Sequence, residues 1–254
     1  MRDQQADLHF HALAGLDDGP ATLEDSVALI RAAQADGTTR IAATPHVRSD
    51  YVTDLSDLHE RVRELRSAVG AAGLAVSVRP GGELGHDMVG RLGQRELDSI
   101  AQGPPGARWL LVETPFPGID EDFHAATEEL RDRGFGIVIA HPERSADAEL
   151  FGSAGLRREI AAGARAQVNA QSLTGEHGPA SRTAAFALIR EGRVAIVGSD
   201  AHGPTRPPLL EKARRELVEA GFDPVVGRTL TLAGPLGLLA RGLDAAERRG
   251  VLVA

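Results

Sequence analysis

Short apolar runs alternate with longer amphipathic segments along most of the chain. Each apolar run ends in a loop rich in Gly, Pro, Asp or His. The segment after it carries apolar residues at helical spacing, as Leu58, Val62 and Leu65 do. Strands that alternate with helices form βαβ units and therefore a parallel sheet. The expected strands cover residues 6–11, 40–44, 74–83, 108–113, 136–141, 165–169 and 194–199.

Helix signals follow the expected strands. Thr22 and Asp25 form a capping-box pattern at the start of the first helix, and Gly37 ends it. No linker or low-complexity stretch divides the chain, so we expect one domain over residues 1–254. Seven strand–helix units favour a closed or nearly closed α/β barrel over an open sheet. The expected helices cover residues 22–36, 55–71, 88–97, 120–133, 156–162 and 180–191, followed by a helical remainder from Pro207 with breaks at Gly221 and Gly234-Pro235.

Residue types that bind metals stand at the ends of the expected strands. His9 and His11 are two positions apart on a strand, so their side chains point to the same face. Active sites of barrels of this kind are built at the C-terminal ends of their strands. Asp7 is expected either to support one of these imidazoles or to cap the strand. The candidate metal ligands are His9, His11, Asp18, His46, Glu83, Glu113, His141, Asp200 and His202.

The remaining histidines, His59, His86, His124 and His177, fall on expected helices or polar loops, so we expect them to be exposed to solvent. The nine candidate ligands are too many for one tetrahedral zinc ion and suit two or three ions that share carboxylates. Mixed imidazole and carboxylate ligands favour Mn, Fe or Zn over Ca or Mg.

The charge of such a cluster suits a phosphate group. Three divalent ions carry six positive charges, and the four candidate carboxylates offset four of them. Arg144 and Arg206 follow two of the candidate histidines in the same loops. A guanidinium group can hold two phosphate oxygens at once, although each arginine could instead pair with a nearby acid.

Composition excludes several other classes of protein. The chain has no cysteine, which excludes disulfides and thiolate catalysis. Its only lysine is Lys212, expected on a surface helix, which argues against a carbamylated lysine between metal ions. The net charge of −8 argues against a nucleic-acid binder. The apolar runs are shorter than a membrane span, and residues 1–5 show no secretion signal, so a cytoplasmic location is expected.

Taken together, the strand-end residues resemble the polymerase and histidinol phosphatase (PHP) superfamily of metal-dependent phosphoesterases. Within it they resemble the bacterial PHP-type protein-tyrosine phosphatases of capsule and exopolysaccharide operons. The segments that carry this resemblance are Leu16-Asp17-Asp18-Gly19-Pro20, Ala43-Thr44-Pro45-His46, Val112-Glu113, Ala140-His141-Pro142-Glu143-Arg144, Gln167-Val168-Asn169, Ser172-Leu173-Thr174-Gly175 and Ser199-Asp200-Ala201-His202.

The resemblance implies a distorted (β/α)7 TIM-like barrel of the PHP type, with a cluster of three metal ions. It implies hydrolysis of phosphotyrosine on a partner protein, the tyrosine kinase that regulates capsule or exopolysaccharide synthesis. By motif, the nine candidates become metal ligands, and Arg144 and Arg206 become phosphate contacts. The chain departs from the family pattern in its Arg/Ala-rich helices and in the loop around Tyr51, which affects expected substrate contacts.

The expected mechanism is attack on phosphorus by a hydroxide that bridges the metal ions, in line with the leaving phenolate. Three alternatives stay open at this point. A small-molecule phosphatase, such as a histidinol-phosphate phosphatase, would share the ligands. An amidohydrolase would use the His-x-His pair but is disfavoured by the shortage of lysine. A non-catalytic, metal-binding regulator would not need so complete a ligand set.

Overall fold

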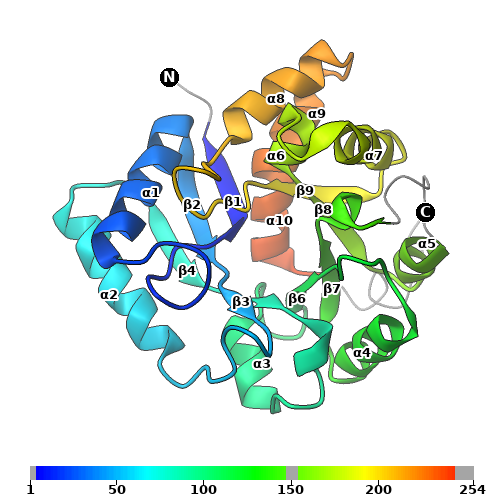
Figure 1. Cartoon of the computed structure of the whole chain (residues 1–254), viewed down its shortest axis with the longest axis horizontal. Coiled ribbons are helices and arrows are strands. Elements are labelled where there is room, and N and C mark those ends of the chain that lie inside the picture. Colours follow the sequence, from blue (N-terminus) through cyan, green and yellow to red (C-terminus); the bar gives the residue numbers. More distant parts are fainter. Residues whose placement is uncertain (1–3, 147–153, 244–254) are drawn as a thin grey trace.

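The computed structural model describes residues 4–146 and 154–243, and its strands lie at the centre with helices around them (Figure 1). Every pairing between strands is parallel. One sheet has the order β1-β2-β4 and the other the order β3-β5-β6-β7-β8-β9. The strands are β1 Gln5–Phe10, β2 Thr38–Ala43, β3 His46–Val47, β4 Ser77–Pro80, β5 Glu83–Leu84, β6 Trp109–Glu113, β7 Gly136–Ala140, β8 Arg165–Asn169 and β9 Val194–Gly198.

One expected strand, residues 74–83, is divided between the two sheets as β4 and β5, which corrects the prediction that it is continuous, and β3 is added after the expected strand 40–44. The chain leaves β2, passes Pro45 and pairs again as β3, while β4 and β5 are separated by two glycines. Pro45 has no N–H to donate to a ladder. A Cβ at Gly82 would lie 3.0 Å from the Ile100 side chain, so the backbone there is packed too closely for a larger residue.

The two sheets meet where β1 and β9 end. Phe10 forms a parallel bridge with Ala201, and the His11 N–H donates to the Ala201 carbonyl at 3.0 Å. The Asp200 N–H donates to the His9 carbonyl at 2.9 Å. The prediction of an α/β fold with parallel strands is confirmed. The C-terminal ends of β1 and β9 therefore lie side by side where the two sheets meet.

Most helices cover the outside of the strands, whereas the helix Gly234–Arg241, α10, lies in the middle of the view between β1 and β9 (Figure 1). The first begins where expected: Thr22 caps it, and the reciprocal bonds of a capping box join Thr22 and Asp25. The structure adds one helix that the sequence pattern did not predict, α6, directly after β8. The helices are α1 Leu23–Asp36, α2 Leu58–Ala71, α3 Gln94–Ile100, α4 Glu121–Asp132, α5 Ala154–Ala161, α6 Ala170–Thr174, α7 Gly178–Arg190, α8 Leu210–Glu219, α9 Pro224–Arg228 and α10 Gly234–Arg241, with short 3-10 helices at His86–Met88 and Pro142–Arg144.

The expected break at Gly234-Pro235 is wrong. Helix α9 continues through a π-helical turn, Thr229–Ala233, into α10 without leaving helical geometry. Pro235 is the second residue of α10 and has no N–H to donate to the turn before it, which is the π-helical turn. No helix among the described residues is both long enough and apolar enough to cross a membrane.

Alternation along the strands explains where the polar side chains lie. In β6, Trp109 and Leu111 pack in a cluster with Leu238 of α10, whereas Leu110 and Val112 pack in the other apolar cluster. The Trp109 indole N–H also donates to the Leu238 carbonyl at 3.2 Å. Since side chains two apart share a face, Glu113 belongs to the face of Trp109 and Leu111. It lies at the opposite end of the strand from Trp109 and α10.

Candidate metal centre

Four ligand-type atoms lie at the centre of the candidate site, and their residues are completely or almost completely buried. They are the Nε2 atoms of His9 and His11, Oε2 of Glu83 and Oδ1 of Asp200. Each histidine Nε2 lies 3.2–3.4 Å from the Glu83 oxygen and 3.4 Å from the Asp200 oxygen. The two nitrogens are 3.3 Å apart. Four ligands about 2.1 Å from one tetrahedral ion lie about 3.4 Å from one another, so this spacing matches an ion-binding site.

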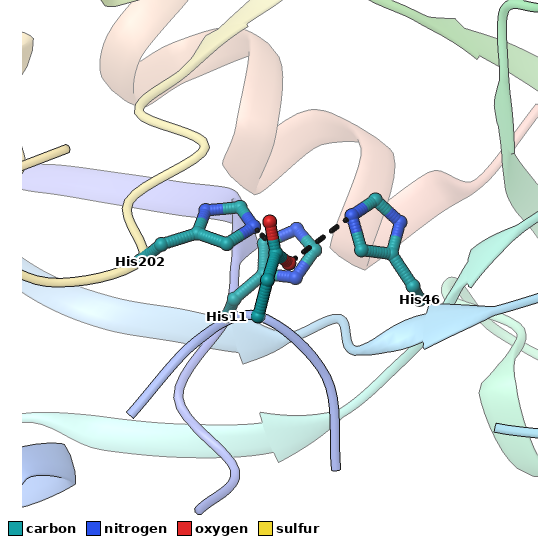
Figure 2. Close-up of side chains that lie close together, drawn as sticks. His11, His46 and His202 are labelled. Atoms are coloured by element: carbon teal, nitrogen blue, oxygen red, sulfur yellow. Dashed lines mark ion pairs between the residues drawn. The ribbon is translucent and has the colours of Figure 1, made fainter. Parts of the chain in front are cut away.

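A second group of ligand atoms surrounds Asp18, in the loop after β1. Asp18 Oδ1 lies 3.1 Å from His202 Nε2 and 3.5 Å from His46 Nε2. Figure 2 shows His11 between His46 and His202, and the rings of His11 and His202 stack with centroids 3.7 Å apart. These four residues hold their ligand atoms within 4.8 Å of one another.

A third group contains His46, Glu83 and Glu113. His46 Nδ1 lies 2.9 Å from Glu83 Oε2 and 3.6 Å from Glu113 Oε2. The ninth candidate, His141, places its Nε2 2.7 Å from the other Glu83 oxygen, Oε1. The structure therefore gathers all nine candidate ligands around one connected volume, in which Glu83 touches two of the groups and His141.

Several buried ligand-type atoms in this volume lie close to one another but form no hydrogen bond of suitable geometry among the described residues. They are His46 Nδ1, Glu83 Oε2, Asp200 Oδ1 and His202 Nε2. Leaving a buried polar atom without a partner is unfavourable, and natural proteins rarely do so. Imidazole nitrogens and carboxylate oxygens are also the donors that divalent transition metals accept. The residues present therefore fit a metal cluster.

Two residues whose roles the sequence did not predict hold the candidate histidines in place. Asp17 Oδ2 lies 2.7 Å from His11 Nδ1 and accepts the His46 N–H at 3.0 Å. Gln167 Oε1 lies 3.0 Å from His9 Nδ1 and accepts the His141 N–H at 3.2 Å. Such partners fix the orientation of the ring and leave the other nitrogen for a metal. Both residues stand in the motif segments. Gln167 lies 158 residues from His9, and Asp17, although only six residues from His11, lies in a loop whose path the sequence pattern does not predict.

Hydrogen bonds hold the Asp200 carboxylate through one of its two oxygens. Its Oδ2 accepts hydrogen bonds from Asn169 Nδ2 at 2.6 Å, Arg144 Nη1 at 3.0 Å and Arg206 Nη2 at 2.7 Å. Its Oδ1 faces His9 and His11 instead. Both expected phosphate contacts thus pair with an acid in this structure, which was the alternative interpretation of each arginine.

The backbone is in the left-handed region at two candidate ligands, with φ of 52° at Asp200 and 35° at His141. His141 directly follows β7, and Asp200 is the second residue after β9. This conformation is uncommon for residues other than glycine and clusters at functional sites. It turns both side chains sharply at the strand ends, where the other candidate ligands lie.

Arg48 is a further residue that the sequence did not single out. One of its nitrogens, Nη1, donates to both Glu113 oxygens at 2.8 and 2.9 Å, while Nε and Nη2 hold the two Asp50 oxygens at 2.7 Å each. The guanidinium also lies over the Tyr51 ring, 5.3 Å from its centroid. Arg48 therefore fixes the orientation of Glu113.

Asp7 supports the backbone instead of an imidazole. It is fully buried, and its carboxylate accepts the N–H of Ser199 at 3.1 Å and that of His9 at 3.2 Å. The interpretation of Asp7 as an imidazole partner is therefore not what the structure shows. Burial raises the pKa of this carboxyl to about 6, although these hydrogen bonds oppose the rise.

The expectation that the four other histidines are solvent-exposed is right for His59 and wrong for His124. His124 on α4 is buried, and its Nδ1 contacts the carboxylate of Glu159 on α5. His86 and His177 are half-buried. The partner of His124 lies 35 residues away along the chain, so the sequence does not show what pairs with its ring.

Comparison with known families identifies the family of this chain. A family model described as capsular polysaccharide synthesis, CpsB/CapC, matches residues 5–237. The chain belongs to this family. Membership in the CpsB/CapC family confirms the resemblance to the PHP-type phosphatases of capsule operons.

Curated relatives and a solved structure agree with the CpsB/CapC assignment. The putative tyrosine-protein phosphatase CapC of Staphylococcus aureus is 30% identical over 209 residues, covering 81% of this chain and 80% of CapC. The tyrosine-protein phosphatase YwqE of Bacillus subtilis is 29% identical, covering 77% of this chain and 76% of YwqE. A crystal structure from a study of YwqE and of CpsB from Streptococcus pneumoniae, described as metal-dependent tyrosine phosphatases, aligns with a TM-score of 0.78 and 26% identity. It covers 92% of this chain and 93% of the solved one.

The electrostatics of this CpsB/CapC chain favour charged ligands at the cluster. Burial alone would raise the pKa of Glu83 and of Asp200, but the surrounding histidines hold the pKa of both well below the usual range. Burial opposes the charged form of His46, yet its contacts with Glu113 and Glu83 raise its pKa to about 9. The carboxylates of Glu83 and Asp200 are therefore ionised at neutral pH and available to cations.

Two cavities open beside the candidate centre of this CpsB/CapC chain. One of about 610 Å³ is lined by Glu113, His141 and Arg144. The other, of about 700 Å³, is lined by Asp18, His202 and Arg206. Both volumes lie in the range of small-molecule sites. The cluster can therefore be reached by a ligand from two sides.

Proposed function

We propose that this CpsB/CapC chain is a metal-dependent protein-tyrosine phosphatase that hydrolyses phosphotyrosine on a partner protein. The observation that carries the proposal is the set of buried ligand atoms on His46, Glu83, Asp200 and His202, which face one another without hydrogen bonds among the described residues. The names of the relatives support the substrate class, since CapC and YwqE are both named tyrosine-protein phosphatases. The solved relatives are described as metal-dependent.

The nine candidate ligands would hold two or three divalent ions, with manganese as the first choice and iron or zinc as substitutes. When bound, the ions would supply a hydroxide nucleophile by lowering the pKa of water and would offset the charge of the phosphate group. The first quartet, His9, His11, Glu83 and Asp200, has the spacing for one ion. The remaining donors are Asp18, His46, His202, Glu113 and His141.

Arg144 and Arg206 would bind the phosphate group. Both guanidiniums already converge on Asp200 Oδ2 at the edge of the cluster, so they would fix this carboxylate and turn their remaining donors toward the substrate. Arg206 Nε is buried and has no hydrogen-bond partner among the described residues. Charge-assisted bonds of this kind strengthen as negative charge builds on the phosphoryl oxygens.

The reaction breaks the bond between phosphorus and the phenolic oxygen, and water supplies the new oxygen. A phenolate is a good leaving group because tyrosine has a pKa of about 10. The reaction therefore needs no strong general acid to protonate the leaving group. Asp17, Gln167 and Arg48 would keep His11, His9 and Glu113 oriented during turnover.

The finer features of the fold and setting are part of the same proposal. The bridge between Phe10 and Ala201 supports closure of the strands into a distorted (β/α)7 barrel. We also propose that residues 1–254 form a single phosphoesterase domain and that the partner is the tyrosine kinase controlling capsule or exopolysaccharide synthesis. A cytoplasmic location stays a prediction from the sequence.

The test is metal analysis of the purified protein combined with phosphate release from three substrates. Protein loaded with Mn²⁺ would be assayed on a phosphotyrosine peptide, a phosphoserine peptide and histidinol phosphate. The proposal predicts clear preference for phosphotyrosine and loss of activity on chelation. Preference for either aliphatic ester would reject the tyrosine assignment in favour of a small-molecule or serine phosphatase.

A further inference from the structure

The cavity of about 610 Å³ contains a feature that the metal centre does not explain. Phe116, in the loop after β6, lines this cavity and yet is 78% exposed. Three other large apolar side chains among the described residues are exposed, Tyr51, Val218 and Val225, and none of them lines either cavity beside the centre. An exposed aromatic ring at the mouth of a cavity marks a surface that a ligand can cover.

The Phe116 ring is presented by a loop that is held in place at several points. Thr114 Oγ1 donates to the Ala140 carbonyl at 2.6 Å, and the Phe116 carbonyl accepts the Ala146 N–H at 2.8 Å. Prolines flank the ring at positions 115 and 117 and restrict the backbone further. The ring is thus exposed without being loosely attached, which reduces the entropy lost on binding a ligand.

The same cavity reaches the reaction centre. Its lining includes Glu113 and His141, which are candidate metal ligands, and Arg144, a candidate phosphate contact. The side chain of Arg144 is 35% exposed, so part of its guanidinium faces the open volume. One ligand could therefore meet Arg144 with an anionic group and Phe116 with the group attached to it.

The second cavity offers a different surface. It is larger, about 700 Å³, and its lining consists mainly of proline, alanine and glycine, with no phenylalanine, tyrosine or tryptophan. It reaches Asp18, His202 and Arg206 on the other side of the centre. Aromatic rings gain from contact with another ring beyond the burial of area alone. The comparison favours the first cavity for an aromatic group.

We propose that the cavity lined by Phe116 binds the aromatic side chain of the substrate, and that Phe116 is the residue that selects aryl over alkyl phosphates. This inference rests on the proposed phosphatase function and adds where the tyrosyl ring lies. The phosphate group would sit at the cluster beside Arg144, with the ring extending toward Phe116. The contact supplies discrimination and takes no part in breaking the P–O bond.

Binding of two phosphonates that the enzyme cannot hydrolyse tests this directly. Calorimetry on the Mn²⁺-loaded protein would compare phenylphosphonate with methylphosphonate for the wild type, Phe116→Ala and Phe116→Leu. The expected result is about 10-fold weaker binding of phenylphosphonate to Phe116→Ala, with methylphosphonate unchanged. Phe116→Leu, which keeps apolar bulk without a ring, should lie between. Because the side chain is exposed, these variants should fold normally.

Ala28→Phe is the matched control, because Ala28 is an exposed α1 residue that lines the second cavity. It should leave the affinity for both phosphonates unchanged. Equal weakening of both ligands in Phe116→Ala, or no weakening, would overturn the inference. Selective loss of phenylphosphonate binding in Ala28→Phe would place the ring in the second cavity and overturn it as well.

The outcome also separates this inference from the proposed function. A wild-type protein that prefers phosphotyrosine peptides, with the preference intact in Phe116→Ala, would refute only the role of Phe116. A wild-type protein that prefers histidinol phosphate and binds both phosphonates alike would refute the phosphotyrosine function itself, and the ring subsite with it. The phenylphosphonate affinity and the peptide KM of Phe116→Ala should change by the same factor.

Discussion

Two groups of mostly buried histidine and acidic side chains differ in how their polar atoms are paired. The strand-end cluster consists of the nine candidate ligands. The α4–α5 cluster consists of His124, Thr127 and Arg131 on α4 and Glu159 on α5. In the α4–α5 cluster, Glu159 Oε1 accepts from Thr127 at 3.0 Å and contacts His124, while Oε2 contacts Arg131. In the strand-end cluster, four buried atoms have no hydrogen-bond partner among the described residues.

The difference separates a structural group from a binding site. A buried ionic group whose atoms are all paired joins two helices and has no capacity left for a ligand. A buried group whose ligand atoms face one another without hydrogen bonds lowers the stability of the fold when no ion is bound. Bound cations would supply the missing interactions. Residue type alone does not distinguish the two, because both contain buried histidine beside buried glutamate.

Glu83→Gln should have the largest effect, because Glu83 touches two of the ligand groups and His141. Replacing its charge with an amide removes an anionic ligand shared across the cluster. The expected loss in kcat on a phosphotyrosine peptide is about 1,000-fold, equivalent to about 4 kcal/mol. Circular dichroism should show an intact fold. Activity within a few-fold of the wild type would contradict the central place of Glu83.

Glu159→Ala tests the assignment of the α4–α5 cluster as structural. It leaves His124 and Arg131 without their buried partner, so the free energy of unfolding should fall by about 3 kcal/mol. Urea denaturation would measure the loss. The kcat of the folded protein and its metal content should stay at wild-type values. A drop in bound metal without a drop in stability would reverse the roles assigned to the two clusters.

Arg144→Ala should affect substrate use and leave the metals in place. Removing its charge-assisted bonds to the phosphate group is expected to lower kcat/KM by about 30-fold, or about 2 kcal/mol. Arg158→Ala is the control, since Arg158 pairs with Glu121 on the exposed surface. Normal kinetics in Arg144→Ala would show that Arg144 serves only as a salt-bridge partner of Asp200.

His177→Gln should have the smallest effect, on the pH dependence of stability. Burial, together with the charges of Arg144 and Arg206, lowers the pKa of His177 to about 4. The folded state therefore favours the neutral ring, and its contribution to stability is present above the ordinary pKa of 6.5 and lost as pH falls toward 4.

Because His177 is partly exposed, the loss between pH 7 and pH 4 should be about 1 kcal/mol larger in the wild type than in His177→Gln. Glutamine can still bond to Ser172, whose Oγ lies 3.0 Å from His177 Nδ1. Urea unfolding at several pH values would measure both curves. Parallel curves would show that His177 is solvated well enough to titrate normally.

Much of the strand-end cluster could be predicted because its information is local. Most candidate ligands follow an apolar run, and parallel strands bring their C-terminal ends together whatever the details of packing. His9, His141 and Asp200 are examples, since each lies at or just beyond the end of a strand. The parallel α/β architecture could be predicted for the same reason.

The remainder depends on contacts between distant segments. The division of β2 from β3 follows from pairing with different neighbours, which the apolar pattern does not record. Arg48 reaches Glu113 across 65 residues, and Glu159 reaches His124 across 35. His124 shares the buried face of α4 with Thr127. Helical periodicity therefore indicated burial at position 124, but the polarity of histidine argued for exposure.

The most direct test of the central claim is a count of bound metal ions. Chelator-treated wild-type protein would be titrated with Mn²⁺ by calorimetry, and metal analysis after desalting would give the ions retained per chain. Two or three ions are predicted for the wild type and for Glu159→Gln, with fewer in Glu83→Gln. A folded wild-type chain that retains no more than one ion, or the same number in Glu83→Gln, would contradict the account.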